Sequence, residues 1–123
     1  MVRVRGCFCV VIDTLYSSGY IICMNQFDST DVFDKWLSKL KDHVGKARIL
    51  SRIDHARFGL FGDCKSVGNG VSEMRISVGP GYRVYFTKVG DRYYFLLAGG
   101  DKSSQTKDIR KAHELADEIN NEG

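Results

Sequence analysis

Residues 62–105 read GDCKSVGNGVSEMRISVGPGYRVYFTKVGDRYYFLLAGGDKSSQ, and this stretch decides the fold. Three segments within it, 71–78, 82–88 and 92–98, have strand character. The two joints between them contain Gly, Pro and Asp, the residues that tight turns favour. The stretch therefore predicts a three-stranded antiparallel meander.

Alternation of apolar and polar residues assigns side chains to the faces of this sheet. In the first segment, we expect Glu73 and Arg75 to lie side by side on an open face. In the second segment, Tyr82 and Phe86 share one face, and Arg83 lies on the other. The third segment is almost entirely apolar and aromatic, which is typical of a central strand covered on both faces.

Apolar residues at helical spacing predict three helices around the meander. The first begins at a Ser29 or Thr30 N-cap, and its buried stripe is Phe33, Trp36, Leu37 and Leu40. The second covers 45–57, with an inward side made in part of Ala47, Leu50, Ile53 and Ala56. The third follows a Ser103 or Ser104 cap, and its stripe is Ile109, Ala112, Leu115, Ala116 and Ile119. With an extra strand expected before the first helix, this order predicts an α+β fold: a two-helix hairpin and a C-terminal helix on a small antiparallel sheet.

The composition is that of one ordinary globular domain of 123 residues. A net charge of +3 permits a nucleic-acid partner without requiring one. No apolar run approaches the length of a membrane span. The cysteines and histidines lack the spacing of a zinc or redox motif, so we expect reduced thiols in a cytosolic protein, with no metal and no cofactor. The cysteines are Cys7, Cys9, Cys23 and Cys64.

Four short blocks stand at spaced positions: GDxK at 62–65, GxGVSExRI at 68–76, GPGYRVYF at 79–86 and GGDKSSQ at 99–105. Together they resemble the RelE/ParE toxin superfamily, and within it the phage-derived, HigB-like branch of addiction module killer proteins. The resemblance covers residues 27–119. It implies a RelE-like fold for this part of the chain.

Residues 1–23 lie outside this resemblance. Family members begin near Met24, so the resemblance implies a toxin domain at 24–123 behind an N-terminal extension. Arg3 and Arg5 precede a short apolar run, but Asp13 interrupts it and no clear cleavage site of a secretory signal follows. One explanation of the extension is a start codon assigned in error upstream of the true one. The alternative is that one of the segments 8–12 and 20–23 adds an edge strand to the sheet. We expect the extension to be poorly packed.

Basic and tyrosine side chains of the meander are the candidates for chemistry: Lys65, Arg75, Tyr82, Arg83, Tyr85 and Lys102. Such a site can cleave RNA without a metal or a histidine, because the ribose 2′-hydroxyl supplies the nucleophile. The protein then has to assist removal of its proton and stabilise the negative charge that develops on the phosphorus. The need for a 2′-hydroxyl restricts this chemistry to RNA.

The resemblance assigns roles to these positions. Arg75 and Lys102 match basic positions expected to contact the phosphate and the transition state, and Lys65 and Arg83 match supporting ones. Arg83 has an alternative role, turned inward and paired with Glu73. RNA-contacting residues would be Tyr82, Tyr85 and Gln105. For the tyrosines the alternative is core packing, and for Gln105 it is support of the last helix.

The resemblance implies the toxin of a type II toxin–antitoxin system, a ribosome-dependent mRNA endonuclease that inhibits translation in the cytoplasm. Its partners would be mRNA, the ribosome and a cognate antitoxin protein. One alternative is a ParE-like inhibitor of DNA gyrase without catalysis. Another is an inactive module that binds RNA or a protein partner. The convergent cations favour the nuclease, because a protein-binding poison needs no phosphate site.

Overall fold

The computed structural model describes the backbone of residues 8–12 and 20–122, and the side chains of residues 24–121. Its strands are β1 (Phe8–Ile12), β2 (Tyr20–Met24), β3 (Gln26–Ser29), β4 (Cys64–Gly68), β5 (Val71–Ile76), β6 (Tyr82–Lys88) and β7 (Tyr93–Asp101). Its helices are α1 (Asp31–Lys39), α2 (His43–Arg57), the 3-10 turn η1 (Lys102–Ser104) and α3 (Gln105–Glu122). This arrangement confirms the α+β fold class.

The main sheet has the strand order β3-β7-β6-β5-β4. Its centre, β5-β6-β7, is the predicted antiparallel meander. The strand expected before the first helix is β3, which pairs in parallel with β7, so the complete sheet is mixed. The remaining edge strand, β4, lies in a stretch to which the sequence pattern assigned no helix or strand. This strand has only five residues, CKSVG, and most of them are exposed. It therefore lacks the alternation of apolar and polar residues by which strands are predicted.

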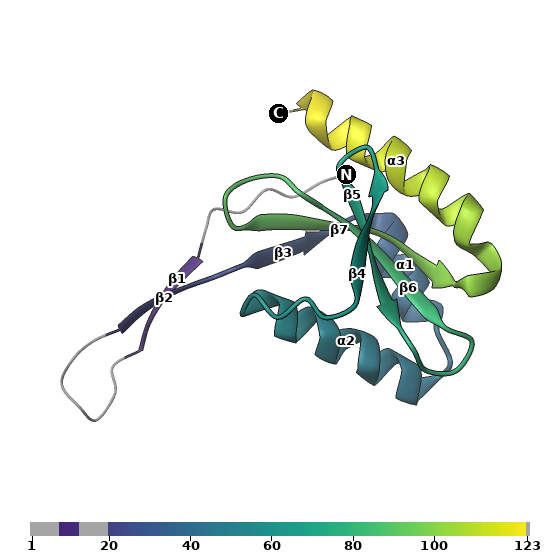
Figure 1. Cartoon of the computed structure of the whole chain (residues 1–123), viewed down its shortest axis with the longest axis horizontal. Coiled ribbons are helices and arrows are strands. Elements are labelled where there is room, and N and C mark those ends of the chain that lie inside the picture. Colours follow the sequence, from purple (N-terminus) through teal and green to yellow (C-terminus); the bar gives the residue numbers. More distant parts are fainter. Residues whose placement is uncertain (1–7, 13–19, 123) are drawn as a thin grey trace.

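The face of the sheet covered by α1 and α2 holds the larger core (Figure 1). Phe33 of α1 and Ile49, Ile53 and Ala56 of α2 pack there against alternate residues of β5, β6 and β7. The inward side predicted for α2 was partly wrong, because Ile49 is buried while Leu50 is 48% exposed. The stripe predicted for α1 is confirmed, since Trp36, Leu37 and Leu40 also pack against this core.

Helix α3 covers the other face of the sheet (Figure 1). Its predicted stripe is confirmed, with Ala112, Ala116 and Ile119 buried against β5, β6 and β7. The expectation that Glu73 lies on an open face is wrong, because this helix covers it and leaves it 0% exposed. Alternation had shown correctly which residues share a face, but it could not show which element covers that face.

Short polar side chains cap the helices where loops meet them. The predicted cap Thr30 accepts a hydrogen bond from the Phe33 amide at 3.2 Å. Asp42 caps α2, which begins two residues earlier than predicted. Asp101 accepts a hydrogen bond from the Ser103 amide at 2.8 Å and caps η1. Ser103 and Ser104, one of which was expected to cap α3, lie within this short turn instead.

Two consecutive glycines let α1 and the start of α3 approach β7 from opposite sides. A Cβ atom at Gly99 would collide with the Trp36 ring, and one at Gly100 would collide with the Asp108 carboxylate. Any larger residue at either position would push a helix away from the sheet.

Strands β1 and β2 pair with each other in a separate antiparallel hairpin that extends from the main sheet (Figure 1). Both segments considered as edge strands are therefore strands, although they do not join the main sheet. Arg3, Arg5 and Cys7 lie outside the described residues. No helix within the described part of the chain is long and apolar enough to cross a membrane.

Candidate active site

Glu73 lies at the centre of the candidate site, on the face of the sheet that α3 covers. A buried carboxylate needs hydrogen bonds or a cation in place of water. Its Oε2 accepts hydrogen bonds from the side-chain Nε2 of Gln105 at 2.7 Å and from the Tyr85 hydroxyl at 3.2 Å. The same oxygen lies 3.8 Å from Nε of Arg83. Glu73 therefore joins β5, β6 and the first residue of α3.

Arg83 is held between this carboxylate and the turn before β6. Its Nη1 donates to the carbonyl oxygens of Gly81 and Tyr82, both at 3.3 Å. Among the described residues, Arg83 Nε and Glu73 Oε1 are buried without a hydrogen-bond partner. The side chain remains 13% exposed. Arg83 is thus turned inward and paired with Glu73, as its alternative role required, while still reaching the surface.

Arg75 lies directly opposite Arg83 in the pairing of β5 with β6. Its Nη2 and Nε donate to Oδ1 of Asp63 at 2.8 and 3.3 Å. The hydrogen bond from Arg75 holds the pKa of the Asp63 carboxyl below its usual value. The two side chains are 37% and 52% exposed, and such surface pairs contribute little stability. The Arg75 guanidinium is therefore held only weakly by Asp63 and remains partly open to solvent.

Lys102 reaches the same place from the end of β7. A Cβ atom built on Gly81 would lie 3.5 Å from Nη1 of Arg83 and 3.8 Å from Cβ of Lys102, so the Arg83 guanidinium and the base of the Lys102 side chain both lie close to this glycine. Gly81 also has a φ of +82°, which other residues rarely adopt. The structure therefore brings together Arg75, Arg83 and Lys102, which we call the cationic cluster.

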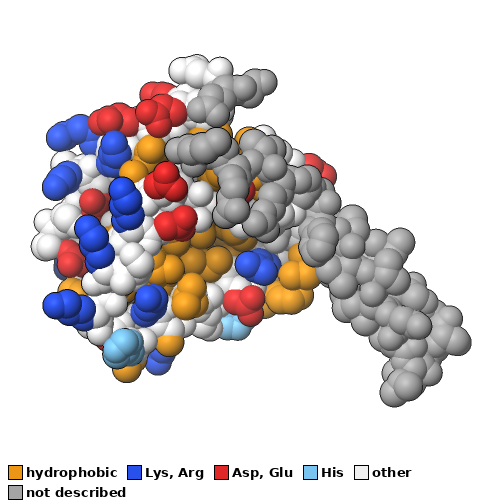
Figure 2. Space-filling model, turned by 180° about the vertical axis from the view of Figure 1, so that it is seen from behind, with side chains coloured by type: hydrophobic (Ala, Val, Ile, Leu, Met, Phe, Trp, Pro, Cys, Tyr) orange, Lys and Arg blue, Asp and Glu red, His pale blue; other side chains and the backbone are white. Residues whose placement is uncertain are grey.

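A hollow at the start of α3 adjoins this cluster. Lys102 and Gln105 line it, together with Lys107 and Arg110 of α3. Figure 2 shows Lys and Arg side chains gathered along the side of the molecule where α3 begins. Lys107 and Arg110 were not singled out from the sequence. Their spacing of three residues places them on one helix face, but the signal is weak because solvated helices commonly carry such pairs.

Lys65 extends the site towards the edge of the sheet. It is the partner of Glu73 in the pairing of β4 with β5, and it is exposed. Directly opposed residues in a sheet project to the same face. Lys65 is therefore on the face that carries the cationic cluster, one strand farther out.

The two tyrosines are placed in the cores. Tyr82 is on the α2 side of the sheet, where its hydroxyl donates to Asp42 at 2.7 Å; this hydrogen bond raises the pKa of Tyr82 to about 12. Tyr85 is 0% exposed beneath α3, and burial raises its pKa. Neither ring is free to stack on a base in this arrangement, which agrees with the packing alternative. Gln105 is the first residue of α3 and supports it through Glu73.

Sequence reasoning named Glu73 only in the alternative role of Arg83, and otherwise expected it on an open face. It did not single out Asp63 as a partner of Arg75. The GDxK block together with the glycine-rich turn at residues 68–70 could have indicated the pairing of Asp63 with Arg75. If this turn joins two strands of a hairpin, Asp63 on the first strand side lies opposite Arg75 on the second. All three residues of that turn have positive φ.

No group of three His, Cys, Asp or Glu side chains that could hold a metal ion occurs in the described ranges. Cys64 is a free thiol, and burial raises its pKa. The side chains of the other three cysteines lie outside the described residues.

Comparison with known proteins gives one informative relative. No family model matches the chain. An uncharacterized protein of Haemophilus influenzae is 51% identical over 94 residues, which cover 76% of this chain and 95% of the relative. Identity at this level over nearly the whole relative means that the two chains share the fold described above.

Proposed function

The chain belongs to the family of this Haemophilus influenzae protein, and we propose that it is a HigB-like toxin of the RelE/ParE superfamily. It would act as a metal-independent, ribosome-dependent mRNA endonuclease in the cytoplasm, neutralised by a cognate antitoxin protein. The observation that carries the proposal is the convergence of Arg75, Arg83 and Lys102 on one face of the sheet.

The proposed reaction is transfer within the RNA strand. The ribose 2′-oxygen forms a bond to the adjacent phosphorus, and the bond from phosphorus to the 5′-oxygen of the next nucleotide breaks. The 2′-hydroxyl loses its proton, and the departing 5′-oxygen gains one. Negative charge develops on the phosphate oxygens between these events, and fixed cations stabilise it more than they stabilise the substrate.

Each member of the cluster has a distinct task in this proposal. Arg75 binds the phosphate after exchanging Asp63 for it, and Lys102 lies beside the same space on a short turn. Arg83 is held in place by Glu73, which also fixes Gln105 and hence the turn that carries Lys102. Lys65 would contact a flanking phosphate.

Induced expression in a bacterium, with mapping of the 5′ ends of cellular mRNA, tests this function. We expect growth arrest and cuts within translated messages.

Replacing Lys102 with Ala should lower cleavage about 100-fold, as expected when one transition-state donor is lost. Lys39→Ala, which removes an exposed lysine of α1, is the matched control. Arrest with intact mRNA and damaged chromosomal DNA would instead indicate a gyrase inhibitor. Binding of RNA without cleavage would indicate an inactive module.

A further inference from the structure

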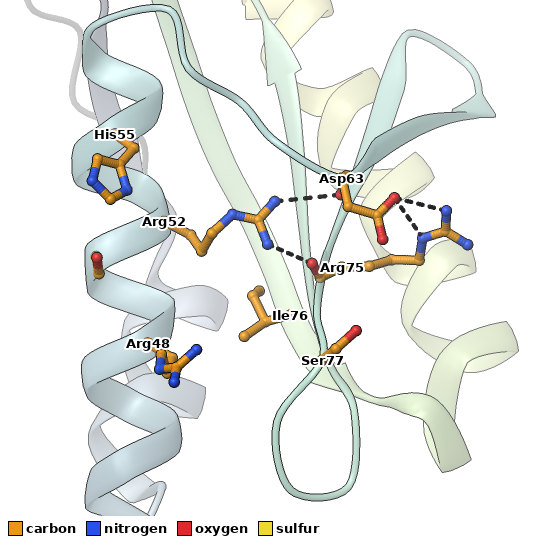
Figure 3. A pocket seen from close by; sticks show the side chains of 8 residues that line it. Arg48, Arg52, His55, Asp63, Arg75, Ile76 and Ser77 are labelled. Carbon is orange, nitrogen blue, oxygen red and sulfur yellow. Dashed lines mark hydrogen bonds and ion pairs between the residues drawn. The ribbon is translucent and has the colours of Figure 1, made fainter.

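A second hollow lies on the other side of Arg75, between α2 and the end of β5, with a volume of about 460 Å³. Helix α2 contributes Arg48, Ser51, Arg52 and His55 to its lining, and the remainder is formed by Asp63, just before β4, and by residues 75–77 (Figure 3). Three of the four residues from α2 are basic: Arg48, Arg52 and His55. No role in the proposed cleavage uses the residues of α2.

Arg52 forms the fixed part of this hollow. Its guanidinium donates to the carbonyl oxygen of Arg75 at 2.6 Å and to that of Phe61 at 2.9 Å, and it lies 3.4 Å from that of Asp63. Figure 3 shows it reaching from α2 to the backbone of the sheet. Because these acceptors are uncharged, they hold the side chain in place without cancelling its charge. The hollow thus has a preorganised positive charge.

Arg48 and His55 flank Arg52 along the same face of α2, about one turn away on either side (Figure 3). Both are exposed, and neither side chain has a hydrogen bond or ion pair to another described residue. From Arg48 to His55 the helix rises about 10 Å. The hollow therefore presents a line of available donors beside one fixed cation.

The one acidic side chain in the lining does not oppose an anion there. The Asp63 carboxylate is bound by the Arg75 guanidinium at 2.8 Å. Figure 3 shows both groups directed away from α2. Arg75 also links the two sites, because its carbonyl binds Arg52 while its strand position is opposite Arg83. A polyanion bound at the cationic cluster could continue past Arg75 into the hollow.

We propose that this hollow binds a backbone phosphate of single-stranded RNA, separately from the cationic cluster. Guanidinium groups match phosphate oxygens in geometry and charge, and a hydroxyl and an imidazole add further donors. The choice of RNA rests on the proposed function, whereas the choice of a phosphate rests on these side chains. The site would hold the strand in register without reading its sequence.

Fluorescence anisotropy with the full chain and a labelled single-stranded oligoribonucleotide tests the proposal. The probe carries 2′-O-methyl riboses throughout, so binding is measured without cleavage. Arg48→Ala should weaken binding about tenfold, as loss of a charged hydrogen bond does. It should also reduce the slope of log affinity against log salt by about 0.7, the value for one phosphate contact on a single strand.

Arg57→Ala is the matched control, because it removes the same charge from an exposed position of α2 outside the hollow. Equal losses of affinity for Arg48→Ala and Arg57→Ala would overturn the proposal in favour of general charge attraction.

Failure of the wild-type chain to bind the probe would also overturn the proposal. Displacement of the probe by polyglutamate at equal charge concentration would assign the hollow to an acidic protein segment instead. Failure of mRNA cleavage in cells would contradict the proposed function alone, since this binding assay requires no catalysis.

Discussion

The two faces of the main sheet are built on different principles. The α1 and α2 face is an aromatic and aliphatic core, in which Phe27, Phe61, Phe86 and Tyr94 contact one another in stacked, tilted and edge arrangements. The α3 face also has a core, in which Tyr85, Tyr93 and Phe95 lie among aliphatic side chains, but it contains in addition a buried carboxylate paired with a cation. Both faces therefore bury an apolar core, and the α3 face adds a charged pair that is almost entirely buried.

Phe86→Ala should have the largest effect on stability, because it removes the ring at the centre of the aromatic core. Phe86 is 5% exposed, and loss of such a ring lowers the free energy of unfolding by about 4 kcal/mol. Urea denaturation measures this change. Phe58→Ala is the control, since Phe58 is 58% exposed and should change stability little. Similar losses for both variants would contradict the assignment of this core.

Glu73→Gln should have the next largest effect, because it leaves Arg83 largely buried without its anion. Breaking a buried pair in this way costs about 3 kcal/mol of unfolding free energy. The same denaturation experiment measures it, with Glu118→Gln on the exposed side of α3 as the control. An unchanged or raised stability would mean that the carboxylate is not needed to hold Arg83.

Asp42→Asn should make a smaller change that depends on pH. Hydrogen bonds from the Gly45 amide and then the Tyr82 hydroxyl lower the pKa of Asp42 below 3.8 in the folded state. Its charge therefore stabilises the fold above pH 3.8, and this contribution is lost as the pH falls through the lowered value. Asn keeps the helix cap. The urea midpoints of the two proteins should differ at pH 6 and converge in acid; a constant difference would contradict the assignment.

Asp63→Asn should have the smallest effect, and on binding rather than stability. It releases Arg75 from an exposed ion pair and adds one net positive charge. We expect about threefold tighter binding of the 2′-O-methyl oligoribonucleotide with an unchanged melting temperature. Asp54→Asn, an exposed position of α2, adds the same net charge elsewhere. Equal gains in the two variants would mean that Asp63 does not compete with RNA for Arg75.

Most of the fold could be predicted because periodicity reports which side chains share a face. The pattern placed β6, β7, α1 and α3 correctly, and it separated Tyr82 from Arg83 across the sheet. It could not show that α3 folds back over Glu73, since that depends on contacts between distant segments. Strand β4 was missed because an exposed edge strand requires little hydrophobic patterning.

The cations of the candidate site were predictable, as was the alternative in which Arg83 pairs with Glu73, but the pairing of Arg75 with Asp63 was not. Arg75, Arg83 and Lys102 lie on or directly after strands of one meander, so their convergence follows from the predicted topology. The pairing of Arg75 with Asp63 requires β4, and the role of Glu73 requires α3. The phosphate site proposed beside α2 depends on Arg52 crossing to the backbone of β5, which no local pattern reveals.

The parallel pairing of β3 with β7 has a consequence for biosynthesis. Gln26 of β3 pairs with Tyr93 of β7, so the first strand of the main sheet must wait for the last one to leave the ribosome. Lys102 and α3 are translated later still. Under the proposed activity, a chain still being made lacks the groups that would attack its own message. Under the same proposal, a message cut before the codon of Lys102 would yield only fragments that lack the complete site.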